Sequence, residues 1–164
     1  MTATVEAATL EDLDALVECW LALVESQRTF GSHIESEPNR TVARQLLAEY
    51  VDAEMVAVAR TASGLVGFVM FYEETGTYEQ SVRRGVIENV YVRPTARGEG
   101  VGSALLDHAE AALADRGVDV VSIAAMAEND RAIGFYEDRG YSPHRIVFER
   151  HLAEGESVNE PATK

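Results

Sequence analysis

The sequence predicts an α+β fold, with a central mixed but mostly antiparallel sheet of about six to seven strands flanked by about four helices. Strand-like segments follow one another directly over residues 55–93, which is typical of antiparallel pairing. A glycine-rich turn at residues 98–102 then joins a strand to a helix and a further strand, which indicates one parallel pair. With 164 residues, 46% of them hydrophobic, the chain can bury a real core. We expect one domain over residues 1–152 and a polar, disordered tail over residues 153–164.

The first half of the chain begins with a short strand and two amphipathic helices. Thr9-Leu10-Glu11-Asp12 reads as a capping box, with Thr9 as the N-cap of the first helix. Apolar residues at helical spacing include Cys19, for which we expect a packing role. The expected elements are a strand at 4–8, helices at 10–26 and 39–51, and a hairpin of strands at 55–60 and 65–72.

The second half of the chain continues with a long strand and then the strand–helix–strand step. Gly117 and Gly140 are expected to end the two helices of this half, as C′ glycines. The expected elements are a strand at 82–93, a helix from 104 to Gly117, a strand at 118–125, a short helix at 129–139 and one or two strands within 141–152.

Charge and composition exclude several classes of function. A net charge of −14 argues against nucleic-acid binding and against docking on anionic membranes. Cys19 is the only cysteine and no signal peptide is visible, so we expect a cytoplasmic protein with no disulfide and no metal site. Lys164 is the only lysine. An acidic, lysine-poor composition resembles proteins of salt-loving organisms, but an ordinary acidic protein from an arginine-favouring organism remains an alternative.

The glycine turn predicts a pyrophosphate-binding site. A strand at Val90-Tyr91-Val92 is stopped by Pro94 and followed by the pattern R-x-x-G-x-G, formed by Arg97, Gly100 and Gly102. Such a turn directs unpaired N–H groups out of a helix N-terminus, and Arg97 adds a planar positive charge. A P-loop is excluded because no lysine lies near the turn, and the dinucleotide pattern G-x-G-x-x-G fails because Ser103 stands at its last glycine. A plain tight turn is the alternative.

The strand and turn resemble the coenzyme A loop of the GNAT superfamily of acyl-CoA N-acyltransferases. A second segment, at its expected place, resembles the family pattern N-x-x-A-x-x-F-Y-x-x-x-G-[FY]; its residues are Asn129, Ala132, Phe135, Tyr136, Gly140 and Tyr141. The resemblance is strong over about residues 82–142. It implies an acetyl-CoA-dependent N-acetyltransferase that acts by direct transfer to an amine, with acetyl-CoA as co-substrate and no metal.

The resemblance also implies roles for individual residues. Backbone groups of Val90 and Val92 would pair with the pantetheine arm, Asn129 would bind its amide, and Tyr136 would protonate the departing thiolate. The pyrophosphate would be held at Arg97, Gly98, Glu99, Gly100, Val101, Gly102 and Ser103. We expect the side chain of Glu99 to face solvent. For Asn129, helix capping alone is an alternative, and Tyr136 has a packing role as its alternative.

Glu88 is the candidate general base. Strand alternation places it on one face with Val86 and Val90, and apolar neighbours would raise the pKa of a carboxyl group toward that of a useful base. An ion pair of Glu88 with Arg83 or Arg84 is an equal alternative, and some members of the family rely on water alone.

The acceptor amine stays open at this point. The irregular segments 27–38 and 73–84 are the natural walls of an acceptor pocket. Their acids, Glu35, Glu37, Glu73 and Glu74, favour a cationic small-molecule or peptide amine. A homodimer is compatible with the family. A non-catalytic acyl-CoA sensor is the alternative function, and the presence of Tyr136 favours the enzyme.

Overall fold

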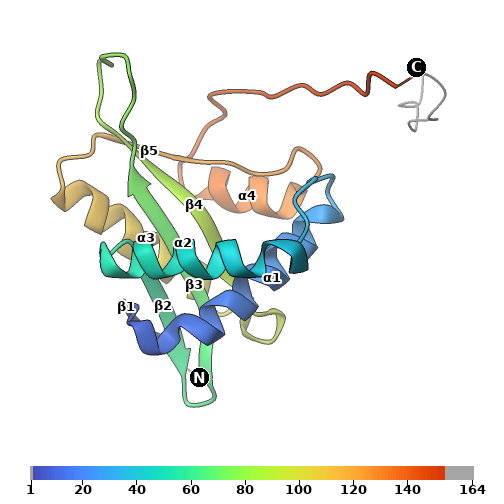
Figure 1. Ribbon diagram of the computed structural model, residues 1–164. Coiled ribbons are helices and arrows are strands. Elements are labelled where there is room, and N and C mark those ends of the chain that lie inside the picture. Colours follow the sequence, from blue (N-terminus) through green and yellow to red (C-terminus); the bar gives the residue numbers. More distant parts are fainter. Residues whose placement is uncertain (1, 154–164) are drawn as a thin grey trace. The chain divides into compact units, whose positions relative to one another are not determined.

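The computed structural model describes residues 2–153, and its contacts divide the chain into two compact units (Figure 1). The first unit ends at Asn129 and contains every strand of the sheet together with three α-helices. The second unit begins at Asp130 and contains the fourth α-helix. The expected C-terminal tail lies outside the described residues, apart from Ala153.

The elements follow the expected order closely. The strands and α-helices are β1 (Thr4–Ala7), α1 (Leu13–Arg28), α2 (Arg40–Asp52), β2 (Val56–Thr61), β3 (Gly64–Glu73), β4 (Arg84–Val92), α3 (Val101–Asp115), β5 (Val120–Ile123) and α4 (Asp130–Asp138). Three short 3-10 turns precede α1, α2 and α3, at Leu10–Asp12, Glu37–Asn39 and Pro94–Ala96.

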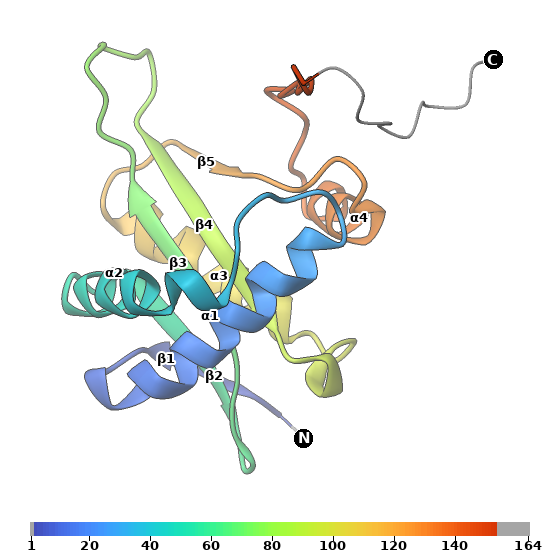
Figure 2. The same ribbon diagram turned by 45° about the vertical axis from the view of Figure 1, so that its right-hand side comes forward.

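The five strands form one mixed sheet in the order β1-β2-β3-β4-β5. The pairs β1–β2, β2–β3 and β3–β4 are antiparallel, whereas β4–β5 is parallel. Figure 2 shows β1 at the edge of this sheet, beside β2. The α+β class and the mostly antiparallel sheet are therefore confirmed, with five strands where about six to seven were expected.

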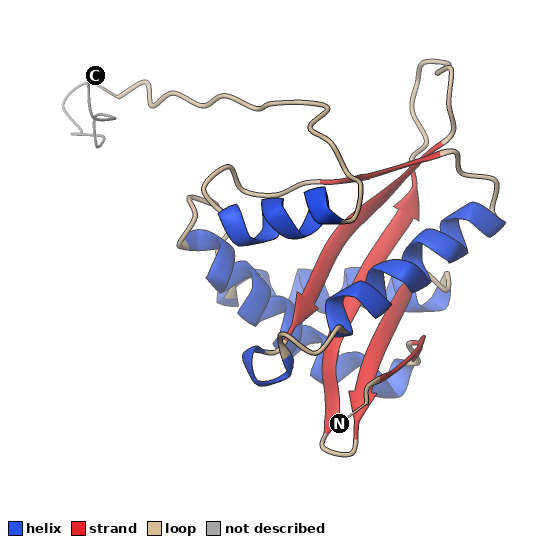
Figure 3. Ribbon diagram, turned by 180° about the vertical axis from the view of Figure 1, so that it is seen from behind, coloured by secondary structure: helices blue, strands red, loops and turns tan. Residues whose placement is uncertain are grey.

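Helices cover the sheet on both faces. On one face, α1 and α2 bury a cluster that includes Leu16, Leu47, Phe68 and Met70, and also Cys19, which is 1% exposed (Figure 1). This position confirms the packing role expected for Cys19. On the opposite face α3 packs closely (Figure 3), since a Cβ atom at Gly85 would lie 2.8 Å from Leu113 Cδ1.

The prediction of one or two strands within residues 141–152 is wrong. The structure has no helix or strand there, and Ile146, Val147 and Phe148 are 73%, 79% and 88% exposed. Adjacent β-branched and aromatic residues give a segment only a local preference for extended backbone. A strand exists only where a neighbouring strand completes its hydrogen-bond ladder, and sequence pattern alone cannot supply that partner.

A buried carboxylate stabilises the start of α1. Asp12 is 5% exposed and accepts a hydrogen bond from the Thr9 backbone N–H at 2.8 Å, as the capping box predicts. It also pairs with the guanidinium of Arg60 on β2, which reaches Glu6 on β1 as well. Burial raises the pKa of Asp12, but the hydrogen bonds from Arg60 and Thr9 outweigh it, so the pKa lies below its ordinary value.

We expect Asp12→Asn to lower the free energy of unfolding at pH 7 by about 2–4 kcal/mol, because the half-buried Arg60 loses its buried partner. Since folding lowers the pKa of Asp12, its contribution is complete above about pH 4 and disappears as the pH falls through the folded value. Urea unfolding at pH 7 and pH 3 should therefore show a smaller difference between variant and wild type at pH 3. Asp14→Asn is the control, because Asp14 pairs with Arg44 at the surface. An equal loss in both variants would contradict the assignment.

Candidate functional site

Strands β4 and β5 diverge after a short parallel contact. Their pairing joins Arg84–Ile87 to Val120–Ile123 and ends there. From Asn89 to Val92, the residues of β4 pair with β3 on the other edge. Within the described sheet, β5 therefore leaves the backbone groups of Val90 and Val92 on the β5 side of β4 without a ladder partner. An extended ligand chain can pair along such an edge.

A β-bulge interrupts β4 at Glu88. Asn89 pairs with Met70 and Ile87 pairs with Phe71, so Glu88 is an extra residue without an opposite partner on β3. The expectation that Glu88 shares a face with Val86 and Val90 is therefore only half right. Val86 pairs with Tyr72, on the face of α1 and α2, whereas Val90 pairs with Val69, on the face of α3. Side chains of a regular strand alternate between the two faces of the sheet, but the residue inserted at the bulge reverses this alternation for the residues that follow it.

Two tyrosines that the sequence analysis did not single out surround Glu88. The Tyr50 hydroxyl, from α2, hydrogen-bonds the Glu88 carboxylate, and the rings of Tyr50 and Tyr72 meet edge to face with centroids 6.3 Å apart. Burial, followed by the charge of Glu88, raises the pKa of Tyr50 to about 12. The same two causes raise the pKa of Tyr72. The sequence hinted only at the position of Tyr50: it follows Leu46 by four residues, which places Leu46 and Tyr50 on one side of α2.

The acids and arginines of the 73–84 segment form their own ion pairs. Arg83 lies 3.3 Å from Glu73, and Arg84 lies 3.2 Å from Glu74. The partner of Glu88 is the Tyr50 hydroxyl. The structure thus offers Glu88 a hydroxyl donor where the sequence suggested a guanidinium.

The glycine turn has the backbone that a helix-terminus anion site requires. Gly98 and Gly100 both have φ of +81°, a conformation that residues with a Cβ rarely adopt. Gly100 is the N-cap of α3, and its carbonyl accepts the N–H of Ala104 at 3.0 Å. The N–H groups of Val101, Gly102 and Ser103 therefore precede the first hydrogen bond of the helix. The side chain of Glu99 is exposed, as expected.

Arg97 is anchored beside this turn. Its Nε donates to the carbonyl of Val92 at 2.9 Å, and its guanidinium carbon lies 5.8 Å from the centre of the Tyr91 ring. These contacts connect the charge at the turn to the end of β4.

Asn129 closes the first unit, and its N–H donates to the carbonyl of Met126 at 2.9 Å. Helix α4 follows and contains Tyr136, whose ring centre lies 5.6 Å from that of Phe135 and 6.1 Å from that of Tyr141. Burial raises the pKa of Tyr136 to about 12. Its hydroxyl therefore keeps its proton throughout the physiological range of pH.

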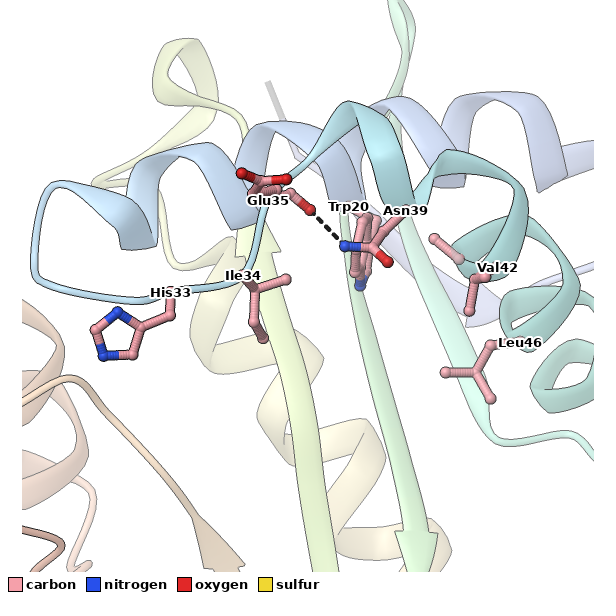
Figure 4. A pocket seen from close by; sticks show the side chains of 8 residues that line it. Trp20, His33, Ile34, Glu35, Asn39, Val42 and Leu46 are labelled. Carbon is pink, nitrogen blue, oxygen red and sulfur yellow. Dashed lines mark hydrogen bonds between the residues drawn. The ribbon is translucent and has the colours of Figure 1, made fainter. Parts of the chain in front are cut away.

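A hollow of about 470 Å³ lies between α1, α2 and the segment that joins them (Figure 4). The side chain of Asn39 closes one side, because its Nδ2 donates to the Glu35 carbonyl at 2.8 Å. The lining residues are Trp20, His33, Ile34, Glu35, Asn39, Val42, Ala43 and Leu46. The segment 27–38 thus contributes to a pocket, as expected, whereas the segment 73–84 does not line this one.

Residues 2–153 contain no cluster of three His, Cys, Asp or Glu side chains that could hold a metal ion. Over the same residues, no helix is long and apolar enough to cross a membrane.

Comparisons with known proteins agree with this geometry. The family model described as "Acetyltransferase (GNAT) family" matches residues 20–141, which is more than half of the chain. A GCN5-related N-acetyltransferase from Ralstonia eutropha is similar, with a TM-score of 0.74 and 20% identity over 93% of this chain and 100% of that chain.

Two further solved structures hold coenzyme A. The PaiA N-acetyltransferase of Thermoplasma acidophilum has a TM-score of 0.72 and 17% identity, over 90% of this chain and 94% of that chain. An aminoglycoside N-acetyltransferase has a TM-score of 0.72 and 15% identity, over 93% of this chain and 96% of that chain. At these identities, the likeness is one of fold.

Proposed function

Because the chain belongs to the acetyltransferase (GNAT) family, we propose that it transfers an acetyl group from acetyl-CoA directly to a primary amine of a small molecule or peptide. One observation carries the proposal: the open edge of β4 leads directly into a glycine turn that begins α3. The edge suits an extended amide chain and the turn suits a pyrophosphate, and coenzyme A contains both.

The donor site follows from this continuity. Backbone groups of Val90 and Val92 pair with the pantetheine arm. The amides from Gly98 to Ser103 bind the pyrophosphate, and Arg97 adds a positive charge beside them. Asn129 binds the pantetheine amide. The coenzyme A held by two structures of the same fold supports this assignment.

The transfer step needs a base and an acid. Glu88 accepts a proton from the acceptor's ammonium group, directly or through water, and the freed amine attacks the thioester carbonyl. The new C–N bond forms as the C–S bond breaks, and the nitrogen then loses a second proton to water, which balances the proton that Tyr136 gives up and regains from water. Tyr136 gives its proton to the departing thiolate, and its raised pKa keeps that proton in place until then.

We also propose that residues 1–152 act as one N-acetyltransferase domain. The family match supports this, because it runs across the division between the two units. A cytoplasmic location is proposed from the single cysteine, Cys19, which lies in the core. A homodimer is compatible with the family.

We expect Gly100→Ala to weaken binding of coenzyme A about tenfold or more in isothermal titration calorimetry. A Cβ disfavours φ of +81°, and a changed turn moves the amides away from the phosphates. Gly64→Ala is a matched control: Gly64 also has a positive φ, of +111°, and open space for a Cβ, but it is the first residue of β3, beside the β2–β3 turn. Equal affinity in both variants would contradict the site.

Catalysis is tested by release of free thiol from acetyl-CoA in the presence of a panel of amines. The proposed function predicts release with at least one primary amine. If the protein bound coenzyme A tightly but released no thiol with any amine, the proposed enzyme activity would be contradicted. The alternative, a non-catalytic acyl-CoA sensor, would then be favoured.

A further inference from the structure

Glu88 is held at the edge of an aromatic pair. The bulge turns its side chain to the face of α1 and α2, where the Tyr50 hydroxyl hydrogen-bonds its carboxylate. The ring of Tyr72 meets that of Tyr50 at 79°, with centroids 6.3 Å apart. A carboxylate beside aromatic rings is the combination that binds organic cations, because both the negative charge and the ring faces attract them.

The lining of the hollow continues toward this group along α2. Val42 and Leu46 line the hollow, and Tyr50 follows Leu46 by four residues, so it lies one turn further on the same side of the helix. Trp20, Leu46 and Tyr50 also pack against the same core cluster while remaining half-buried. Apolar side chains therefore lead from the hollow to the Glu88 carboxylate.

The α1–α2 segment, part of which lines the hollow, also lies near the residues that follow β5. The segment that joins α1 and α2 approaches the chain after β5, since a Cβ atom at Gly31 would lie 3.9 Å from the Met126 methyl carbon. An acceptor placed between α1 and α2 is on the same face of the sheet as Glu88.

The charged side chains of this region are acidic. Glu35 lines the hollow, Glu88 lies beyond it, and no arginine or lysine is among the hollow's lining residues. Arg40 and Arg44, on α2, are engaged with acids at the surface.

We propose that Tyr50, Tyr72 and Glu88 form the subsite for the acceptor's ammonium group, and that the acceptor is a primary amine on an apolar stem lying along Trp20 and Leu46. This inference rests on the proposed function and specifies its acceptor. Tyr72 selects the cation through its ring. Tyr50 is a positioning residue: its hydroxyl occupies one acceptor site of the carboxylate and leaves the others for the ammonium group.

The only tryptophan of the chain, Trp20, lines the hollow, so its fluorescence reports binding without any need for turnover. The probes are hexylammonium chloride and hexan-1-ol, which share a stem and differ in charge. If the subsite is present, the wild type should bind hexylammonium at least about tenfold more tightly than hexan-1-ol. Glu88→Gln and Tyr72→Leu should each reduce this preference to about threefold or less.

Two variants serve as controls. Tyr72→Phe keeps the ring and should keep the preference within about twofold, and Glu49→Gln removes a neighbouring exposed carboxylate with the same result. Tyr50→Phe should lower kcat several-fold with little change in KM, whereas Tyr72→Leu should mainly raise KM. Glu88 is exposed, so Glu88→Gln remains informative if Tyr72→Leu fails to fold.

Equal binding of the alcohol and the ammonium ion by the wild type would overturn the proposal, and so would an unchanged preference in Glu88→Gln. A clear preference for hexylammonium over hexan-1-ol in a protein that never releases thiol would support the subsite and contradict the proposed function. Acetyl transfer by a protein that does not prefer hexylammonium to hexan-1-ol would support the proposed function and contradict the subsite.

Discussion

We expect Glu88→Gln to lower kcat for acetyl transfer by about 10²–10⁴-fold, the range for loss of a general base, while the affinity for acetyl-CoA should stay within about twofold. The reason lies in the bulge, which turns this carboxylate to the face of α1 and α2, whereas in the proposed function the donor is held by backbone groups of Val90 and Val92. Steady-state kinetics with a saturating amine gives kcat, and calorimetry gives the affinity.

The matched control is Glu49→Gln, since Glu49 is an exposed carboxylate next to Tyr50 that does not lie on β4. It removes the same charge from the same region and should leave kcat within about twofold. A similar kcat for Glu88→Gln and Glu49→Gln would contradict the base role and point to proton transfer through water alone.

Tyr136→Phe is expected to reduce kcat by a similar factor of about 10²–10⁴, because the thiolate would leave without a proton. The ring remains, so its contacts with Phe135 and Tyr141 are preserved. Affinity for acetyl-CoA should change less than about twofold. Since burial raises the pKa of Tyr136 to about 12, wild-type kcat should show no loss from this group up to about pH 10.

Tyr78→Phe is the control, because Tyr78 is 85% exposed and lies in the 73–84 segment. Its kcat should match the wild type. If Tyr136→Phe weakened binding of acetyl-CoA but kept kcat at saturation, Tyr136 would be a binding or packing residue.

Local patterns predicted most elements of this fold. Helices α1 and α2 repeat apolar residues at a period that only a helix satisfies, and Gly117 and Gly140 both have the positive φ expected of C′ glycines. The glycine turn was recognisable for the same reason, because its whole motif lies within six residues, from Arg97 to Gly102. Each of these features depends on contacts between near neighbours in the chain.

Features that depend on distant partners were missed. The bulge at Glu88 exists only in relation to β3, and Tyr50 meets Glu88 from a helix 38 residues earlier in the chain. The strand expected within 141–152 failed for the same reason. Strand alternation therefore placed Glu88 correctly on β4 but gave it one wrong neighbour, Val90.

In the proposed function, strand β4 divides recognition between a side chain and peptide groups. If the proposed function holds, Glu88 meets the acceptor through its side chain, whereas Val90 and Val92 meet the donor through their peptide groups. Peptide groups are identical in every residue, but side chains differ. Mutation of side chains around Glu88, such as Tyr72, could therefore change which amine is acetylated without weakening the binding of coenzyme A. This strand would let acceptor choice evolve independently of donor choice.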